Sequence, residues 1–177
     1  CTILFACLTS LSATGLAQQT RIINGKPANI SSYPWLASLY VGSESDPETG
    51  GGCGGSLISS RWVLTAAHCF LNEAGDQVSS DAATRTSITL NTTNINTPAS
   101  GAVVREANRV IVHPSYNPDA QSSANSNDFD IALVELSAAV SIEPVRLFTG
   151  ELPENLPTIV AGWGATVGDG SSAAESL

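Results

Sequence analysis

Apolar residues are grouped in short runs from position 18 onward, and Gly, Pro, Ser and Asn separate one run from the next. Runs of β-branched, aromatic and leucine side chains predict strands, here at residues 35–41, 56–58, 62–66, 87–90, 109–112 and 131–136. This part of the chain shows no long run of apolar residues at the spacing of a helix. Many short strands joined by turns predict an antiparallel sandwich or barrel, and they argue against a parallel sheet with crossover helices.

Three polar stretches between the predicted strands have the composition of exposed loops. They cover residues 42–52, which are acidic and rich in glycine, residues 72–84, and residues 117–127, which are rich in Ser and Asn. Loops of this kind lie on the surface, where they can border a binding cleft. A surface loop without such a role is the simpler expectation for each of them.

The first 17 residues differ from the rest of the chain. Residues 3–16 carry no charged side chain, and Gly15 and Ala17 are small enough for the positions that a signal peptidase recognises. We therefore expect residues 1–17 to be a secretion signal. We expect its basic start to be missing, because the sequence contains no methionine. A buried helix or a membrane anchor is the alternative, but the run is shorter than the roughly 20 residues that span a bilayer.

The four cysteines divide between this expected signal and the mature chain. Removal of the signal takes away two of them and leaves Cys53 and Cys69. An even pair in a secreted, extracellular protein predicts a disulfide. In the same context Asn29 and Asn91 are candidate glycosylation sites, because each begins an Asn-X-Ser/Thr sequence.

Composition and charge narrow the class of protein. With 42% hydrophobic and 13% charged residues, the chain has the make-up of a folded domain. Its 16 Asp and Glu against 7 Lys and Arg give a formal net charge of -9. This excess repels phosphate groups and anionic lipids, so neither nucleic acid nor a membrane is expected as a partner.

The strongest local pattern is Leu64-Thr65-Ala66-Ala67-His68-Cys69, in which an apolar strand ends in small residues that carry a histidine beside a cysteine. An imidazole gains and loses a proton near neutral pH, so His68 is a candidate general base if a third group orients its ring. A disulfide at Cys69 would anchor the neighbouring backbone. A histidine at the end of a strand is, taken alone, more often structural.

A second pattern places a carboxylate at the start of an apolar strand. Asp130 leads directly into residues 131–136, at the edge of the expected core. A carboxylate in this position needs hydrogen-bond donors to offset its desolvation, and an imidazole N–H is a suitable donor. A strand-capping turn residue is the simpler explanation, and Asp128 is a competing candidate for the same role.

A third pattern lies just after the expected signal, where Arg21 precedes the β-branched pair Ile22-Ile23 and Asn24-Gly25. Cleavage after Arg21 would give Ile22 a new amino terminus. Such an amine could be buried only against a carboxylate, because an unpaired buried charge is costly. The hypothesis therefore requires an acidic partner elsewhere in the protein.

Six segments carry a resemblance when they are taken together and in order. They are Arg21-Ile22-Ile23-Asn24-Gly25, Tyr33-Pro34-Trp35, Cys53-Gly54-Gly55-Ser56-Leu57-Ile58, residues 62–69, residues 130–136 and Ala161-Gly162-Trp163-Gly164. Their order and spacing resemble the trypsin and chymotrypsin family of serine proteases from Arg21 to about Gly164. Six motifs in one order are a specific signal, although each motif alone is weak.

The resemblance implies an all-β fold of two six-stranded antiparallel barrels, of which this chain covers the first barrel and the start of the second. It implies that His68 is the general base and later the general acid, and that Asp130 orients it. It also implies activation by cleavage after Arg21, with residues 18–21 as the propeptide and 22–177 as an incomplete peptidase domain. Protein or peptide substrates, protein inhibitors as further candidate partners and a monomeric state are the corresponding expectations.

No cofactor or metal is expected. Some members of the family bind calcium on a loop after the histidine strand. That site needs carboxylates, and no Asp or Glu lies between Arg85 and Arg105. Among the remaining motif residues, the three tryptophans Trp35, Trp62 and Trp163 are expected to pack, and His113 is expected at the surface without a catalytic role.

The family's nucleophilic serine follows the Gly-Trp-Gly segment, and the 177 residues contain no Gly-Asp-Ser-Gly-Gly sequence. We therefore expect this stretch alone to be inactive in hydrolysis. Two hypotheses follow: an active secreted endopeptidase whose serine lies further along, or a homologue that lost its serine and binds other secreted proteins, for example as an inhibitor. The retained His68, Asp130 and Arg21 favour the first hypothesis, and a structural adhesion domain is a remote third.

Overall fold

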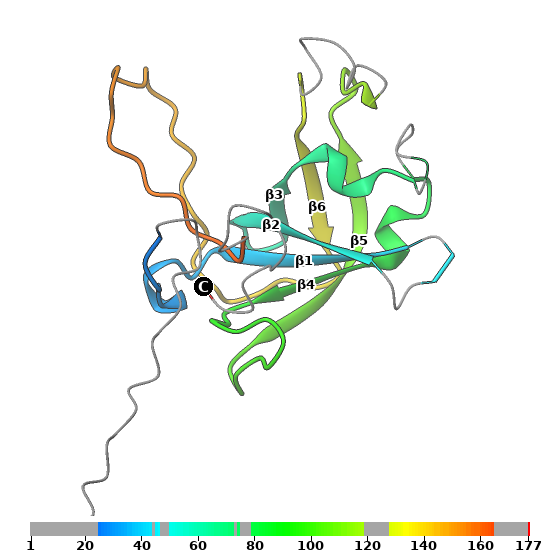
Figure 1. Cartoon of the computed structure of the whole chain (residues 1–177), viewed down its shortest axis with the longest axis horizontal. Coiled ribbons are helices and arrows are strands. Elements are labelled where there is room, and N and C mark those ends of the chain that lie inside the picture. The colour runs from blue at the N-terminus through cyan, green and yellow to red at the C-terminus, as the bar shows by residue number, and fades with distance from the viewer. Residues whose placement is uncertain are drawn as a thin grey trace, which may run out of the picture.

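Six antiparallel strands close into a barrel in the order β1-β2-β3-β6-β5-β4, which confirms the all-β prediction (Figure 1). This computed structural model describes residues 25–43, 45–46, 50–72, 74, 79–118, 128–164 and 177. The expected signal, the expected propeptide and the junction between Arg21 and Ile22 lie outside these residues. The strands are β1 (Leu36–Gly42), β2 (Gly50–Ser59), β3 (Trp62–Thr65), β4 (Thr86–Leu90), β5 (Val103–Val112) and β6 (Ala132–Leu136).

Alternation of buried and partly exposed positions explains how the strands enclose the core. In β4 the buried residues are Thr86, Ile88 and Leu90, and in β6 they are every second residue from Ala132 to Leu136. Because side chains of a strand point to opposite faces in turn, this pattern directs one face of each strand into the barrel. The largest fully buried apolar side chains are Phe70, Leu39, Leu57, Ile88, Leu90, Leu136, Val63 and Val134.

Three short 3-10 helices lie wholly within the described residues, and none of these residues belongs to an α-helix. They are η1 (Ile30–Ser32), η2 (Ala67–Phe70) and η3 (Ala82–Arg85). Helix η2 follows β3 almost directly and inserts the fully buried Phe70 into the core. None of these helices has the length and apolar character needed to cross a membrane.

The pairing of β3 with β6 matters most for the site. Four consecutive pairs join them, from Trp62 opposite Glu135 to Thr65 opposite Ala132. The chain that leaves β3 and the chain that enters β6 therefore meet at the same end of the barrel. Residues 66–68 and 128–131 are brought together there, although they are about 60 positions apart in the sequence.

Two strands are longer than the sequence predicts. The expected strand at 56–58 is the last part of β2, and residues 50–52, expected in an exposed loop, pair with Val41 and its neighbours in β1. Glycines carry no side chain to reveal the alternation, but their backbone groups pair as any others do. Similarly, β5 begins at Val103 and not at Arg109, because apolar and polar residues do not alternate there in step with exposure: Val104 is half exposed, whereas Arg105 is less exposed.

The chain after β6 leaves the barrel and forms no strand between residues 137 and 164, where the resemblance implies the start of a second barrel. In Figure 1 much of this segment runs away from the strands as a long yellow to orange excursion. It exposes Leu147, Phe148, Leu152, Leu156, Ile159 and Val160 by 46% to 81%. A strand needs a neighbour for its backbone hydrogen bonds, and no barrel strand pairs with this segment.

Candidate active site

The imidazole of His68 stands at the barrel end just beyond β3. Ala66 and Ala67 connect it to the strand, and Ala67 is fully buried, so the backbone here is fixed against the core. The His68 side chain itself is 55% exposed. The small residues before the histidine thus let the backbone pack against the core, while the ring stays accessible to solvent.

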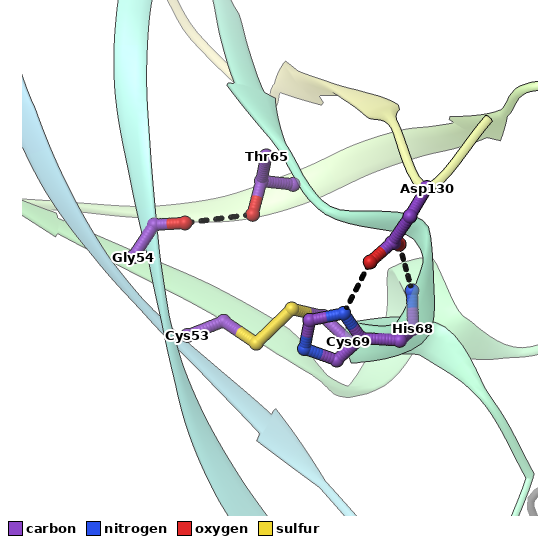
Figure 2. The surroundings of a disulfide bond; sticks show 6 residues. All are labelled: Cys53, Gly54, Thr65, His68, Cys69 and Asp130. Carbon is purple, nitrogen blue, oxygen red and sulfur yellow. Dashed lines mark hydrogen bonds and ion pairs between the residues drawn. A yellow bond between two sulfur atoms is a disulfide. The ribbon is translucent and has the colours of Figure 1, made fainter. Parts of the chain in front are cut away.

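Asp130 binds this histidine through both of its carboxylate oxygens. The His68 backbone N–H donates to Oδ1 at 2.9 Å, and the ring Nδ1 lies 2.7 Å from Oδ2 (Figure 2). The Asp130 side chain is only 18% exposed. One bond fixes the position of the carboxylate relative to the backbone, and the other fixes the rotation of the ring.

The charge state of Asp130 determines the tautomer of the ring. Burial alone would raise the pKa of Asp130, but the hydrogen bonds from the His68 ring and backbone outweigh burial and hold that pKa below its ordinary value of 3.8. An ionised carboxylate can only accept hydrogen bonds, so Nδ1 of His68 carries the hydrogen between them. In the neutral ring the other nitrogen, Nε2, is then left as a proton acceptor on an exposed side chain.

The predicted disulfide between Cys53 and Cys69 is present and lies next to His68 (Figure 2). It joins β2 to η2 across 16 positions of sequence. Close by, the hydroxyl of Thr65 donates to the backbone oxygen of Gly54 at 2.8 Å, which ties the end of β3 to β2. Both contacts join the chain on either side of His68 to β2, in addition to the hydrogen bonds that His68 makes with Asp130.

Metal binding is disfavoured at this cluster. Cys53, His68 and Cys69 are the residues in the described part of the chain whose potential ligand atoms gather within 4.8 Å of one another. The two sulfur atoms are bonded to each other, and thiolates, not disulfides, are the ligands that metals take from cysteine. The group therefore lacks the donors that a metal site requires.

The backbone in front of Asp130 has an unusual conformation that sequence patterns do not reveal. Phe129 has a φ of 59°, in the left-handed region that bulky residues rarely adopt. Its carbonyl accepts a hydrogen bond from the N–H of Ile131 at 2.7 Å, which closes a three-residue turn centred on Asp130. Position 129 is neither Gly nor Asn, so the sequence does not predict the left-handed conformation there.

The other candidate residues lie apart from the histidine. Asp128, the competing carboxylate, is exposed, and the carboxylate hydrogen-bonded to His68 is that of Asp130. Asn29 is exposed and its Oδ1 accepts from the N–H of Ser31 at 3.0 Å. Asn91 is exposed too, and its Nδ2 donates to the Gly101 oxygen at 2.8 Å. Glycosylation at these two residues stays a prediction.

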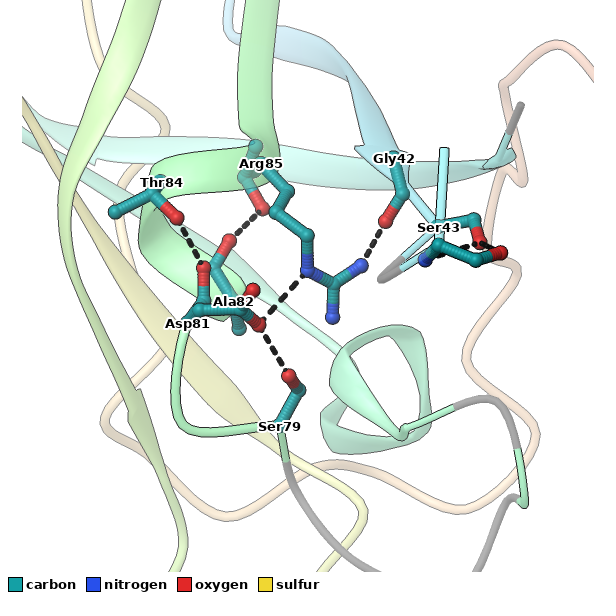
Figure 3. Close-up of polar contacts among 9 residues, drawn as sticks. Gly42, Ser43, Ser79, Asp81, Ala82, Thr84 and Arg85 are labelled. Carbon is teal, nitrogen blue, oxygen red and sulfur yellow. Dashed lines mark hydrogen bonds and ion pairs between the residues drawn. The ribbon is translucent and has the colours of Figure 1, made fainter. Parts of the chain in front are cut away.

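A hollow of about 300 Å³ borders His68 on the side of the disulfide, between β1, β2 and η3. Its far wall includes Arg85, whose Nε donates to Asp81 at 2.9 Å and whose terminal nitrogen donates to the Gly42 oxygen (Figure 3). Hydrogen bonds from Ser79 and from Arg85 lower the pKa of Asp81. This network fixes η3 against the end of β1 and so shapes the wall facing the histidine.

The sequence model of the trypsin family matches residues 22–177. The chain belongs to the trypsin family. It is 32% identical over 182 residues to trypsin II-P29 of Gallus gallus, a match that covers 98% of this chain and 63% of that protein. It is 34% identical over 151 residues to a trypsin of Phaedon cochleariae, which covers 82% of this chain and 50% of that protein.

Trypsin-like architecture is also found in a solved structure titled "Structure of GrC". The two chains superpose with a TM-score of 0.65 at 25% sequence identity, over 88% of this chain and 62% of the other. The present chain thus spans between half and somewhat under two thirds of the length of these relatives. The trypsin family is a family of serine proteases.

Proposed function

We propose that the full-length protein is a secreted serine endopeptidase in which His68 acts as the general base. The observation that carries this proposal is the double contact of His68 with Asp130, at 2.7 Å from the ring and 2.9 Å from the backbone. A structural role would require neither an ionised carboxylate fixed on Nδ1 nor an exposed ring on the other side. Both are what a proton acceptor needs.

The proposed chemistry starts at Nε2 of His68, which takes the proton from a serine hydroxyl as the oxygen attacks the carbonyl carbon of the substrate. The ring becomes an imidazolium, and Asp130 stabilises that charge without itself becoming protonated. The imidazolium then gives the proton to the leaving amine, which breaks the peptide bond. We expect the serine in the full-length protein beyond Leu177, since the 177 residues contain no Gly-Asp-Ser-Gly-Gly sequence.

Activation and secretion belong to the same proposal. Cleavage after Arg21 would free the amine of Ile22, which needs a buried carboxylate as its partner. The apolar start of the chain and the disulfide between Cys53 and Cys69 support passage through an oxidising secretory route. Before such cleavage, the protein is expected to be an inactive zymogen.

The full-length secreted protein, cut after Arg21, is the material for the test. We expect it to react with a serine-directed fluorophosphonate and to hydrolyse peptides, and we expect His68→Ala to abolish both while leaving thermal unfolding close to that of the wild type. An Arg21→Gln variant should stay inactive under the same activating treatment. A correctly folded, cleaved protein that neither reacts nor hydrolyses would overturn the proposal and favour a binding homologue.

A further inference from the structure

Two aromatic rings are stacked beside the proposed active site. The rings of His113 and Phe129 lie parallel, with centroids 4.8 Å apart and planes inclined by 10°. His113 directly follows β5, and Phe129 directly precedes Asp130. Phe129 is 54% exposed, so the stack contributes little to the core of the barrel and calls for another explanation.

Phe129 needs support because of its backbone. Its φ of 59° lies where a side chain with a Cβ crowds the following carbonyl, and Gly or Asn would occupy this region at lower cost. A strained residue persists only where its surroundings hold it. The stacked imidazole of His113 is the contact that holds the ring of Phe129 in place.

His113 also holds the backbone around Asp130. Its N–H donates to the Ile131 oxygen at 3.0 Å, while the Ile131 N–H donates to the Phe129 oxygen at 2.7 Å. The imidazole of His113 is in turn oriented by the N–H of Ser115, which donates to Nδ1 at 3.2 Å. The turn centred on Asp130 is therefore attached to His113 twice, by one backbone hydrogen bond and by one ring contact.

We propose that the stack of His113 on Phe129 is a positioning element that aims the carboxylate of Asp130 at His68. If Phe129 left its left-handed conformation, the Cα–Cβ direction of the next residue would turn, and both oxygens of Asp130 could no longer meet His68. The consequence for catalysis rests on the proposed function. The consequence for the hydrogen bond between the two side chains does not.

Kinetics of the activated full-length protein test the first consequence. Phe129→Ala removes the ring but keeps the Cβ that makes the left-handed backbone unfavourable, and His113→Ala removes the stacking partner. We expect each to lower kcat by about tenfold or more, as small displacements of catalytic groups do, with KM changed less than about twofold. His113→Phe, which restores an aromatic face, should recover most of kcat, and Val104→Ala, which trims a half-exposed side chain on β5, should match the wild type.

Proton NMR tests the second consequence without any need for activity. The Nδ1 proton of His68 should appear at unusually low field while Asp130 accepts it, and Asp130→Asn identifies the signal by its loss. We expect Phe129→Ala and His113→Ala to shift or broaden this signal and His113→Phe to retain it. A Phe129→Ala protein with the wild-type signal overturns the positioning role, whereas an inert wild type with the expected shifts overturns only the proposed function.

Discussion

One histidine uses both oxygens of one carboxylate: the ring of His68 contacts Oδ2 of Asp130 at 2.7 Å, and the His68 backbone N–H donates to Oδ1 at 2.9 Å. The two bonds serve different ends, because the backbone bond fixes the carboxylate whether or not the ring is protonated. Replacing the carboxylate by an amide should therefore separate the electrostatic contribution from the geometric one.

Asp130→Asn tests this separation. The amide can still accept the backbone N–H of His68, but its NH₂ group favours the ring tautomer with the hydrogen on Nε2, which cannot act as the base. We expect kcat of the activated full-length protein to fall by about 10³-fold or more, as measured with a peptide substrate at neutral pH. Asp128→Asn is the matched control, and an equal loss there would contradict the assignment.

Acid stability should depend on Asp130 in a definite direction. Its folded-state pKa lies below the ordinary value of 3.8, so the stabilisation from the ionised carboxylate is present above that value and is lost as the pH falls through the lower folded-state pKa. Denaturant unfolding of wild type and Asp130→Asn should show a difference in unfolding free energy at pH 6 that shrinks toward pH 2. A constant difference would argue against a lowered pKa.

Removal of the disulfide should destabilise the protein globally. The bridge between Cys53 and Cys69 closes a loop of 16 positions, a constraint worth about 3 kcal/mol in the chain-entropy model. The double variant Cys53→Ala/Cys69→Ala should unfold at correspondingly lower guanidinium concentration. Adding a reductant to the wild type should reproduce the shift and should leave the double variant unaffected; a shift in both would place the effect elsewhere.

Gly55 should tolerate no side chain, in contrast to its neighbour in β2. A Cβ at Gly55 would lie 2.7 Å from Cγ1 of Val63 and 3.0 Å from the backbone oxygen of Leu64, whereas a Cβ at Gly54 would meet nothing within 4 Å. We expect Gly55→Ala to lower the unfolding free energy by about 1–3 kcal/mol. Gly54→Ala should be neutral or slightly stabilising. Equal effects in denaturant unfolding would contradict this packing.

Glu135 on β6 links β5 to the turn between β2 and β3. Its carboxylate lies 3.4 Å from Arg61 and 3.3 Å from Arg109, and Arg109 also stacks over Trp62 at 5.4 Å from the ring centroid. Exposed ion pairs contribute little singly, so Glu135→Gln should cost only about 0.5–1 kcal/mol of unfolding free energy. The loss should diminish in high salt. Glu143→Gln, at an exposed site, should show no such loss.

The sequence predicts the fold class well and the strand ends poorly, for identifiable reasons. The strands at residues 62–65 and 132–136 are short runs of mostly apolar residues, and the structure has them almost where the pattern predicts. At the glycines of β2 there is no side chain to alternate. In β5 the exposed Val104 and the less exposed Arg105 break the alternation of apolar and polar residues, so only its apolar end is visible in the sequence.

The contact of His68 with Asp130 depends on the pairing of β3 with β6, which periodicity cannot give, and the resemblance to a family supplied it. Neither the periodicity nor the resemblance predicts the left-handed backbone at Phe129. Left-handed backbone is predicted from Gly or Asn, and a phenylalanine there becomes intelligible only when its stacking partner, His113, is seen in three dimensions.

The closed order of strands separates the geometry of the His68–Asp130 pair from the length of the connecting chain. Since β3 and β6 are direct neighbours, growth or shortening of the connection after β4 would leave the spacing of the two side chains unchanged. The same holds for the connection after β5 as long as His113 and Phe129 at its two ends are kept, because the distance between His68 and Asp130 is set by the pairing of their strands.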